Sequence, residues 1–211
     1  MVKGAQVSSG EYSVWQILDI ANAYYVLSQQ FTNALPRQMV EAAESVPEMG
    51  APVASAMNRI FALELYLKGM VIAVKRPFPL VHDLVTLFHT LPEDIRLRIE
   101  EFYDERSQLN ADPGLSWCIS LYFKLGNKMD SKKTREEQQA AGVDPSLAGL
   151  LERNRGGFIA SRYLFQNSKH DELSRYDYEY HRLAILCSIL CEAIENSVPE
   201  RPGRYTRTFN F

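Results

Sequence analysis

The sequence predicts an all-α protein with a four-helix bundle core and short decorating helices. Apolar residues recur at helical spacing in four long stretches, the pattern of helices that bury one face. These stretches are residues 13–34, 53–75, 93–109 and 177–197. The chain has no alternation of strands and turns, no repeat period and no glycine-rich phosphate loop. A length of 211 residues and a hydrophobic content of 46% fit one helical domain over residues 1–211.

The first half of the chain supplies two of the predicted helices. Ser13 can cap the first helix, and Pro36 stops it because proline cannot continue the hydrogen-bond ladder. Residues 36–50 contain two prolines and end in a glycine, and we interpret them as a connection. Pro52 suits the first turn of the second helix. This helix ends at Lys75-Arg76-Pro77, where two cations lie at the negative end of the helix dipole.

A proline-bearing turn leads to two further helices. Pro79 keeps Phe78 extended, because the residue before a proline avoids the helical region. His82 opens a short helix, and we interpret it as an N-terminal cap with a packing role. Pro92 then begins the helix 93–109, whose first turn carries two carboxylates near the positive end of the dipole.

The second half of the chain is less regular. Residues 115–125 are strongly apolar and fit either a buried helix or a strand, and the helical neighbours favour a helix. Residues 126–146 carry charges of both signs and predict a mobile surface loop, with a segment that orders on a partner as the alternative. A short helix over 147–155 ends at Gly156-Gly157, and a helical pattern resumes over 158–166.

The last long helix follows a polar loop over residues 167–174. Ser174 or Asp177 can cap it. The tail 199–211 carries three arginines and three aromatic residues. Such tails are disordered or pack locally, and nucleic-acid contact is the alternative. Residues 1–10 look equally frayed.

Composition excludes several classes of function. The net charge of −3 and pI of about 5.9 provide no global basic field for nucleic acid, although a local basic patch is compatible with them. Three cysteines in a chain without an apolar signal segment argue against a disulfide framework. Cys187 and Cys191 lie one helical turn apart, but no further ligand completes a metal site, so we expect no metal or cofactor. No apolar run is long enough to span a membrane, and we expect a cytoplasmic protein.

The stretch from Asn58 to Leu91 carries a more specific pattern. It contains Glu64-Leu65-Tyr66-Leu67-Lys68-Gly69, a proline turn, then His82-Asp83-Leu84-Val85-Thr86-Leu87-Phe88 and Leu91-Pro92. This pattern resembles the HEPN domains, an all-helical superfamily of prokaryotes and eukaryotes. The resemblance implies a bundle of HEPN type that pairs as a homodimer. It also implies a setting in prokaryotic toxin–antitoxin or phage-defence systems, with an antitoxin or another protein as partner.

The resemblance also implies which residues a catalytic site would require. Catalytic HEPN domains are metal-independent ribonucleases whose motif is an arginine, four to six residues, then a histidine near the start of a late helix. The segment that matches by position, Glu152 to Phe165, lacks that histidine and looks like the arginine–tyrosine variant without the catalytic pair. We therefore expect little or no ribonuclease activity. Arg175 and His181 are the alternative pair, because an imidazole can act as a general base and an arginine can stabilise phosphate charge.

The same segments supply a candidate binding site. Its residues are Glu64, Lys68, His82, Arg153, Asn154, Arg155, Arg162 and Tyr163. Glu64 and Lys68, one helical turn apart, form either an ion pair at the edge of the core or one wall of an anion-binding cleft. The cations would contact phosphate, and Tyr163 would offer a stacking face. Because Glu64 offsets one cation, we expect an excess of positive charge, unless Arg162 pairs with Glu64 inside the bundle.

These observations lead to three hypotheses about function. The first is a HEPN-like domain that binds RNA, a nucleotide or a partner protein. The second is a metal-independent endoribonuclease that uses Arg175 and His181. The third is a structural dimerisation module without a ligand. For the homodimer, the aromatic-rich start of the last helix, with Tyr176, Tyr178 and Tyr180, offers a surface.

Overall fold

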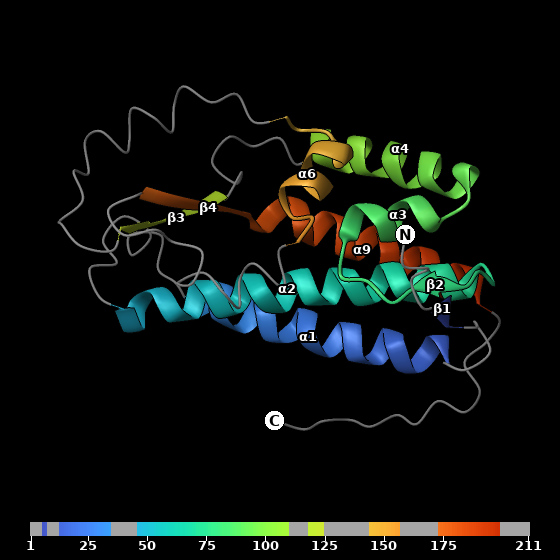
Figure 1. The fold of residues 1–211 in the computed structure, drawn as a ribbon, viewed down its shortest axis with the longest axis horizontal. Helices are drawn as coiled ribbons and strands as arrows, with labels where there is room; N and C mark the ends of the chain where they lie inside the picture. The colour runs from blue at the N-terminus through green and yellow to red at the C-terminus, as the bar shows by residue number, and fades with distance from the viewer. Residues whose placement is uncertain are drawn as a thin grey trace.

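The computed structural model of the chain describes residues 6–7, 13–34, 46–109, 118–124, 144–156 and 173–198. Within these residues a helical core confirms the predicted all-α class (Figure 1). Its helices are α1 (Val14–Ala34), α2 (Val46–Ala73), α3 (Leu84–Thr90), α4 (Glu93–Leu109), α6 (Leu147–Arg153) and α9 (Tyr180–Ser197). Helix α1 lies along α2, α2 packs against α9, and α9 packs against α4. Helix α3 contacts α2 and α4, and α6 contacts α3 and α4.

Buried apolar side chains from all of these helices form one core. Examples from the six helices in turn are Leu18, Leu63, Leu87, Ile99, Leu150 and Leu186. Gly69 lies where α2 passes close to two other helices: a Cβ atom there would lie 3.3 Å from Ile194 Cδ1 and 3.6 Å from Ile17 Cγ2. The absence of a side chain at Gly69 therefore lets α2 pack closely against both α1 and α9. In the described part of the chain, no helix combines the length and hydropathy that crossing a membrane requires.

Two small antiparallel strand pairs lie at opposite ends of the helical core (Figure 1). Strand β1 (Gln6–Val7) pairs with β2 (Phe78–Pro79), which confirms the extended backbone predicted before Pro79. Strand β3 (Cys118–Lys124) pairs with β4 (Leu173–Glu179), with Cys118 opposite Glu179 and Lys124 opposite Leu173.

The β3–β4 pair corrects two predictions. A helix over 115–125 is wrong for residues 118–124, which form a strand. Their β-branched and aromatic residues suit a strand, but the strand that pairs with them lies far along the chain, where local periodicity does not reach. The last helix begins at Tyr180, later than the predicted residue 177, because Leu173–Glu179 continue as β4. Neither Ser174 nor Asp177 is therefore its cap.

The boundaries of the other helices agree with the sequence to different degrees. Helix α4 has the predicted bounds, and α1 begins one residue after Ser13. Helix α2 begins at Val46, within the predicted connection, so Pro47 occupies the first turn and Pro52 lies further inside the helix. A proline in the first turn removes no intrahelical hydrogen bond, so Pro47 starts this helix rather than preventing it. The predicted helix over 158–166, the C-terminal tail and most of the predicted loop 126–146 lie outside the described residues. Of the N-terminal residues 1–10, which were predicted to be frayed, only 6–7 are described, and they form β1.

Candidate functional site

Glu64 is the buried centre of the first polar cluster. Its side chain is 1% exposed, and its Oε1 atom lies 2.7 Å from Lys68 Nζ, as the one-turn spacing predicted. The same carboxylate lies 3.0 Å and 3.1 Å from His82 Nδ1 through its two oxygens. Lys68 is 15% exposed and His82 is 48% exposed, so the cluster reaches from the core to the surface. A carboxylate at Nδ1 favours the proton on that nitrogen, so in the neutral ring the lone pair lies on Nε2.

The residue after His82 connects this cluster to the end of α6. Asp83 is the N-cap of α3, where its Oδ1 accepts a hydrogen bond of 2.8 Å from the Thr86 N–H. This corrects the prediction that His82 caps the helix. The Arg155 Nε atom lies 2.7 Å from Asp83 Oδ2, and the Leu84 N–H donates to the Arg155 carbonyl at 3.2 Å. Two segments that are distant in sequence therefore meet at the dipeptide His82-Asp83.

The charges at this junction stabilise one another. Burial acts to raise the pKa of Asp83, but the Thr86 N–H and the Arg155 guanidinium together hold that pKa below its usual range. Hydrogen bonds to Asp83 and then to Glu152 raise the pKa of Arg155. Arg155 Nη1 lies 3.3 Å from Glu152 Oε1. These contacts are exposed to water, since the Arg155 side chain is 49% exposed and that of Glu152 is 62% exposed.

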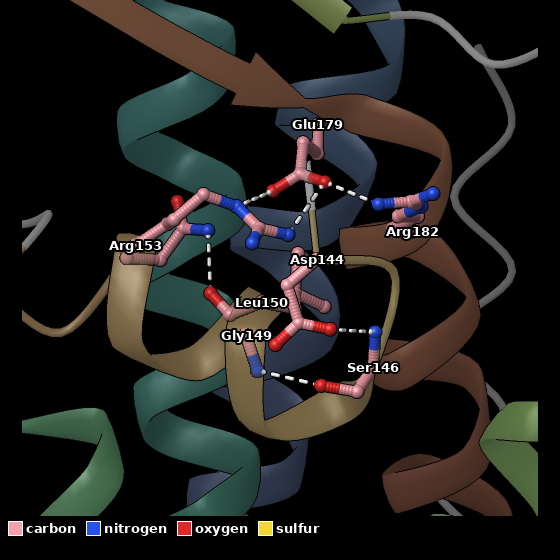
Figure 2. Close-up of polar contacts among 8 residues, drawn as sticks. Asp144, Ser146, Gly149, Leu150, Arg153, Glu179 and Arg182 are labelled. Carbon is pink, nitrogen blue, oxygen red and sulfur yellow. Dashed lines mark hydrogen bonds and ion pairs between the residues drawn. The ribbon is translucent and has the colours of Figure 1, made fainter. Parts of the chain in front are cut away.

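Arg153 belongs to a second cluster, centred on Glu179 (Figure 2). Figure 2 shows the Glu179 carboxylate between the guanidinium groups of Arg153 and Arg182. Arg153 donates to both carboxylate oxygens, at 2.8 Å from Nε and 2.9 Å from Nη2, and Arg182 Nη1 donates at 2.8 Å. The Glu179 side chain is 6% exposed, so this is a buried carboxylate at the end of β4, held by Arg153 of α6 and Arg182 of α9. Arg153 and Arg155 thus serve different clusters, although they are two residues apart.

A turn before α6 completes this second region (Figure 2). Ser146 is the N-cap of α6 and accepts from the Gly149 N–H at 3.0 Å, while Asp144 Oδ1 accepts from the Ser146 N–H at 3.0 Å. A Cβ atom on Gly149 would lie 2.5 Å from Asp144 Oδ2, so the glycine permits this approach. Asn154 closes the other end of α6: it is 4% exposed, and its side-chain amide donates to the Leu150 carbonyl at 2.9 Å. The side-chain amide of Asn154 is therefore already hydrogen-bonded within α6.

A cleft of about 450 Å³ lies between α3 and the region around α6. Val85, Phe88 and Leu151 supply its apolar lining, and His89, Asp144, Glu152 and Arg153 supply its polar groups. His89 Nδ1 lies 2.9 Å from Arg96 Nη1, and because a guanidinium can only donate, this ring nitrogen is placed to accept the hydrogen bond. The carboxylates of Asp144 and Glu152 make the rim of the cleft acidic rather than basic.

The structure describes the remaining candidate residues only in part. Arg162 and Tyr163 lie outside the described residues. Arg175 lies in β4 opposite Tyr122, and its side chain is not described. His181 lies in the first turn of α9, and its Nε2 atom is buried without a hydrogen-bond partner among the described residues. A general base needs access to the proton that it removes, and this nitrogen is enclosed by protein.

The predicted excess of positive charge is not present in the described part of the site. Lys68 pairs with Glu64, Arg153 with Glu179, and Arg155 with Asp83 and Glu152. Sequence reasoning did not include Asp83, Glu152, Glu179 or Arg182 in the site. The spacings Glu152–Arg155 and Glu179–Arg182, three residues each, could have indicated two of these pairs.

Two further predictions concern aromatic and sulfur side chains. Tyr180 was expected at an exposed dimer surface, but it is 3% exposed and its ring centre lies 5.1 Å from the Arg59 guanidinium. Burial raises the pKa of Cys187 to about 12 and that of Cys191 to about 11. Within the described ranges, no group of three or more histidine, cysteine or acidic side chains is arranged to hold a metal ion.

Comparisons of the chain with protein-family models, with curated proteins and with solved structures found no match.

Proposed function

We propose that the chain is a HEPN-like domain that binds the phosphate groups of RNA or of a nucleotide. The binding residues are Lys68, His82 and Arg155, which we call the phosphate surface. The observation that supports this proposal is the junction at His82-Asp83, which joins the Glu64 cluster to Arg155. Three nitrogen-bearing side chains from separate segments are thereby held in one region, and two of them are about half exposed.

The existing ion pairs do not prevent phosphate from binding there. Pairs between exposed charges contribute only about 0–1 kcal/mol, because water already stabilises each partner. The Arg155–Asp83 pair is of this kind, with side chains 49% and 30% exposed. A phosphate oxygen offers Arg155 a charge-assisted and frequently bidentate hydrogen bond in exchange. Glu64, by contrast, is buried and positions Lys68 and His82 before any ligand arrives.

Arg153 and Asn154 are assigned to the fold rather than to the ligand. Arg153 is held by a buried carboxylate through two hydrogen bonds, and removing it would leave Glu179 with one fewer cation. The Asn154 side chain is buried against the end of α6. The resemblance to HEPN domains supports a setting in toxin–antitoxin or phage-defence systems, and we include that setting in the proposal.

The test is a titration of fluorescently labelled single-stranded RNA, followed by anisotropy over a series of salt concentrations, with ATP as a competitor. Arg155→Gln should weaken binding by about tenfold, the effect expected when a charged hydrogen bond is removed. The slope of log affinity against log salt should become shallower by about 0.7 for each phosphate that the variant no longer neutralises.

Arg106→Gln provides the matched control. Arg106 also pairs with a carboxylate, Glu192, and its side chain is 35% exposed, but it lies on α4 outside the phosphate surface. The proposal expects affinity and salt slope to be unchanged in this variant. Equal reductions of affinity in Arg155→Gln and Arg106→Gln would show a diffuse electrostatic attraction and would contradict a specific surface.

A further inference from the structure

The cleft between α3 and α6 is lined by different residues from the phosphate surface. Its volume of about 450 Å³ lies within the range of about 300–1,000 Å³ that is common for small-molecule sites. Apolar side chains form its floor, namely Val85 and Phe88 from α3 and Ala148 and Leu151 from α6. None of the three residues of the phosphate surface lines it. A ligand in this cleft is therefore a separate question from the proposed function.

The basic groups of the lining already have partners within the protein. Arg153 donates from Nε and Nη2 to the buried Glu179 carboxylate, and Figure 2 shows its guanidinium beside that carboxylate. His89 Nδ1 is placed to accept a hydrogen bond from Arg96. Because the charge of Arg153 is balanced by Glu179, the carboxylates of the rim are the charged groups that remain for a ligand.

Asp144 supplies the first of these carboxylates, at the start of α6 (Figure 2). Its Oδ1 accepts a hydrogen bond of 3.0 Å from the Ser146 N–H, and no basic side chain among the described residues forms an ion pair with it. Hydrogen bonds from Ser146 hold the pKa of Asp144 below its usual range, with smaller contributions from Arg153 and Arg182, so the group is charged at neutral pH. Gly149 leaves room for this carboxylate against α6, because a Cβ atom there would lie 2.5 Å from Asp144 Oδ2.

Glu152 supplies the second carboxylate, at the other end of α6. Its side chain is 62% exposed, and its contact of 3.3 Å with Arg155 lies in water, where such pairs are weak. From the N-cap Ser146, which binds Asp144, the helix rises by about 9 Å to Glu152. The apolar floor of the cleft lies between these two ends. The cleft thus has an apolar centre with a negative charge at each end.

We propose that this cleft binds an aliphatic diamine or polyamine, with one ammonium group at Asp144 and another at Glu152. Each ammonium group forms a charge-assisted hydrogen bond with a carboxylate, and the methylene chain between them covers the apolar floor. Fully extended hexamethylenediamine separates its two nitrogens by about 9 Å, given single bonds of about 1.5 Å, and this length matches the separation along α6. A ligand with one ammonium group, such as a lysine side chain of a partner protein, leaves one end of the cleft without a counter-charge.

The first experiment titrates three amines into the full chain at low salt and without RNA, followed by isothermal titration calorimetry. Hexamethylenediamine should bind at millimolar concentrations or below. Hexylamine, which has the same chain but one ammonium group, should bind about tenfold more weakly, the effect expected when one charged hydrogen bond is lost. Ethylenediamine has two ammonium groups but is too short to reach both carboxylates, and it should be weakened to a similar degree. Equal affinities for hexylamine and hexamethylenediamine, or no binding of the diamine, would overturn the proposal.

The second experiment repeats the hexamethylenediamine titration on variants whose folding is checked by thermal unfolding. Asp144→Asn and Glu152→Gln should each reduce the affinity by about tenfold, to the level of hexylamine. Ala148→Trp leaves every charge in place but fills the cleft at an exposed position, and it should abolish binding. Glu195→Gln is the matched control, because it removes an exposed carboxylate of α9 outside the cleft and should leave the affinity unchanged. Unchanged binding in Ala148→Trp, or an equal loss in Glu195→Gln, would show only diffuse attraction and would contradict a site in the cleft.

Discussion

Glu64 and Glu179 are both buried carboxylates with two basic partners, but only Glu64 has a partner that is about half exposed to solvent. Glu64 is held by Lys68, which lies one turn along its own helix and is 15% exposed, and by His82, whose side chain is 48% exposed. Glu179 is held by Arg153 and Arg182, whose side chains are 27% and 29% exposed. The Glu64 carboxylate thus holds the half-exposed imidazole of His82 at the surface. The Glu179 carboxylate lies between two guanidinium groups, each of which forms an ion pair with it.

The position of Glu179 in the chain explains this enclosure. It is the last residue of β4 and directly precedes α9, so its contact with Arg153 fixes the point where the strand becomes a helix. Arg59 holds the same point from α2, since its Nη1 donates to the Tyr180 carbonyl at 2.8 Å. Burial lowers the pKa of Arg59, which stacks near the rings of Tyr25 and Tyr180. The Glu179 cluster therefore maintains the fold, whereas the Glu64 cluster can also serve a ligand.

The largest expected effect is a reduction of stability in Glu179→Ala. Removing one partner of a buried ion pair typically lowers the free energy of unfolding by about 3–5 kcal/mol, and here it leaves Arg153 and Arg182 without the buried carboxylate that they share. Urea denaturation measures this change. Glu192→Ala is the control, because Glu192 also pairs with an arginine but is 52% exposed, and its removal should cost about 0–1 kcal/mol. Similar reductions in the two variants would remove the distinction between an enclosed and an exposed carboxylate.

Glu64→Ala should lower stability less and weaken binding more. His82 is about half exposed and can turn toward water after the change, whereas Lys68, which is 15% exposed, loses its partner. We therefore expect the free energy of unfolding to fall by about 1–3 kcal/mol, the range for an unsatisfied polar group. Because neither side chain is then held in place, RNA affinity measured on the folded protein should fall. If Glu64→Ala destabilises the protein as strongly as Glu179→Ala and leaves the affinity unchanged, the two clusters have the same role.

The pH dependence of Asp83 should be a smaller effect. Its pKa in the folded protein lies below the ordinary value of 3.8, so its contribution to stability is present above that value and is lost as the pH falls through the folded pKa. In Asp83→Ala, which also lacks the helix cap, stability at neutral pH should decrease by about 1 kcal/mol. The difference from wild type should shrink as the pH is lowered below 3.8. A difference that stays constant in urea titrations down to this range would contradict the assignment.

We expect the protein to have little or no ribonuclease activity. The Nε2 atom of His181 is enclosed, and the segment that resembles the HEPN catalytic motif lacks a histidine. Purified protein incubated with labelled RNA and EDTA should leave the RNA intact. Cleavage that disappears in His181→Ala, with the melting temperature unchanged, would establish the Arg175–His181 alternative instead.

Features determined by neighbouring residues were predictable from the sequence, and those determined by distant residues were not. The bounds of α4 follow from Pro92 and the carboxylates after it, and the Glu64–Lys68 contact follows from one-turn spacing. The Arg153–Glu179 contact joins residues 26 positions apart, and the Arg155–Asp83 contact joins residues 72 positions apart. No periodicity indicates such pairs. The same reason applies to β3, because the apolar sequence 118–124 fits a helix until β4 is known as its partner.

The most direct test of the central claim compares two arginines that lie two residues apart. RNA affinity and melting temperature are measured together on Arg155→Gln and Arg153→Gln, with affinity corrected to the folded fraction. Arg155→Gln should lower the affinity and leave the melting temperature nearly unchanged, because its ion pairs are exposed. Arg153→Gln should lower the melting temperature and leave the affinity unchanged, because its partner is buried. The opposite pattern, or equal changes in both quantities, would contradict the division into a binding cluster and a structural cluster.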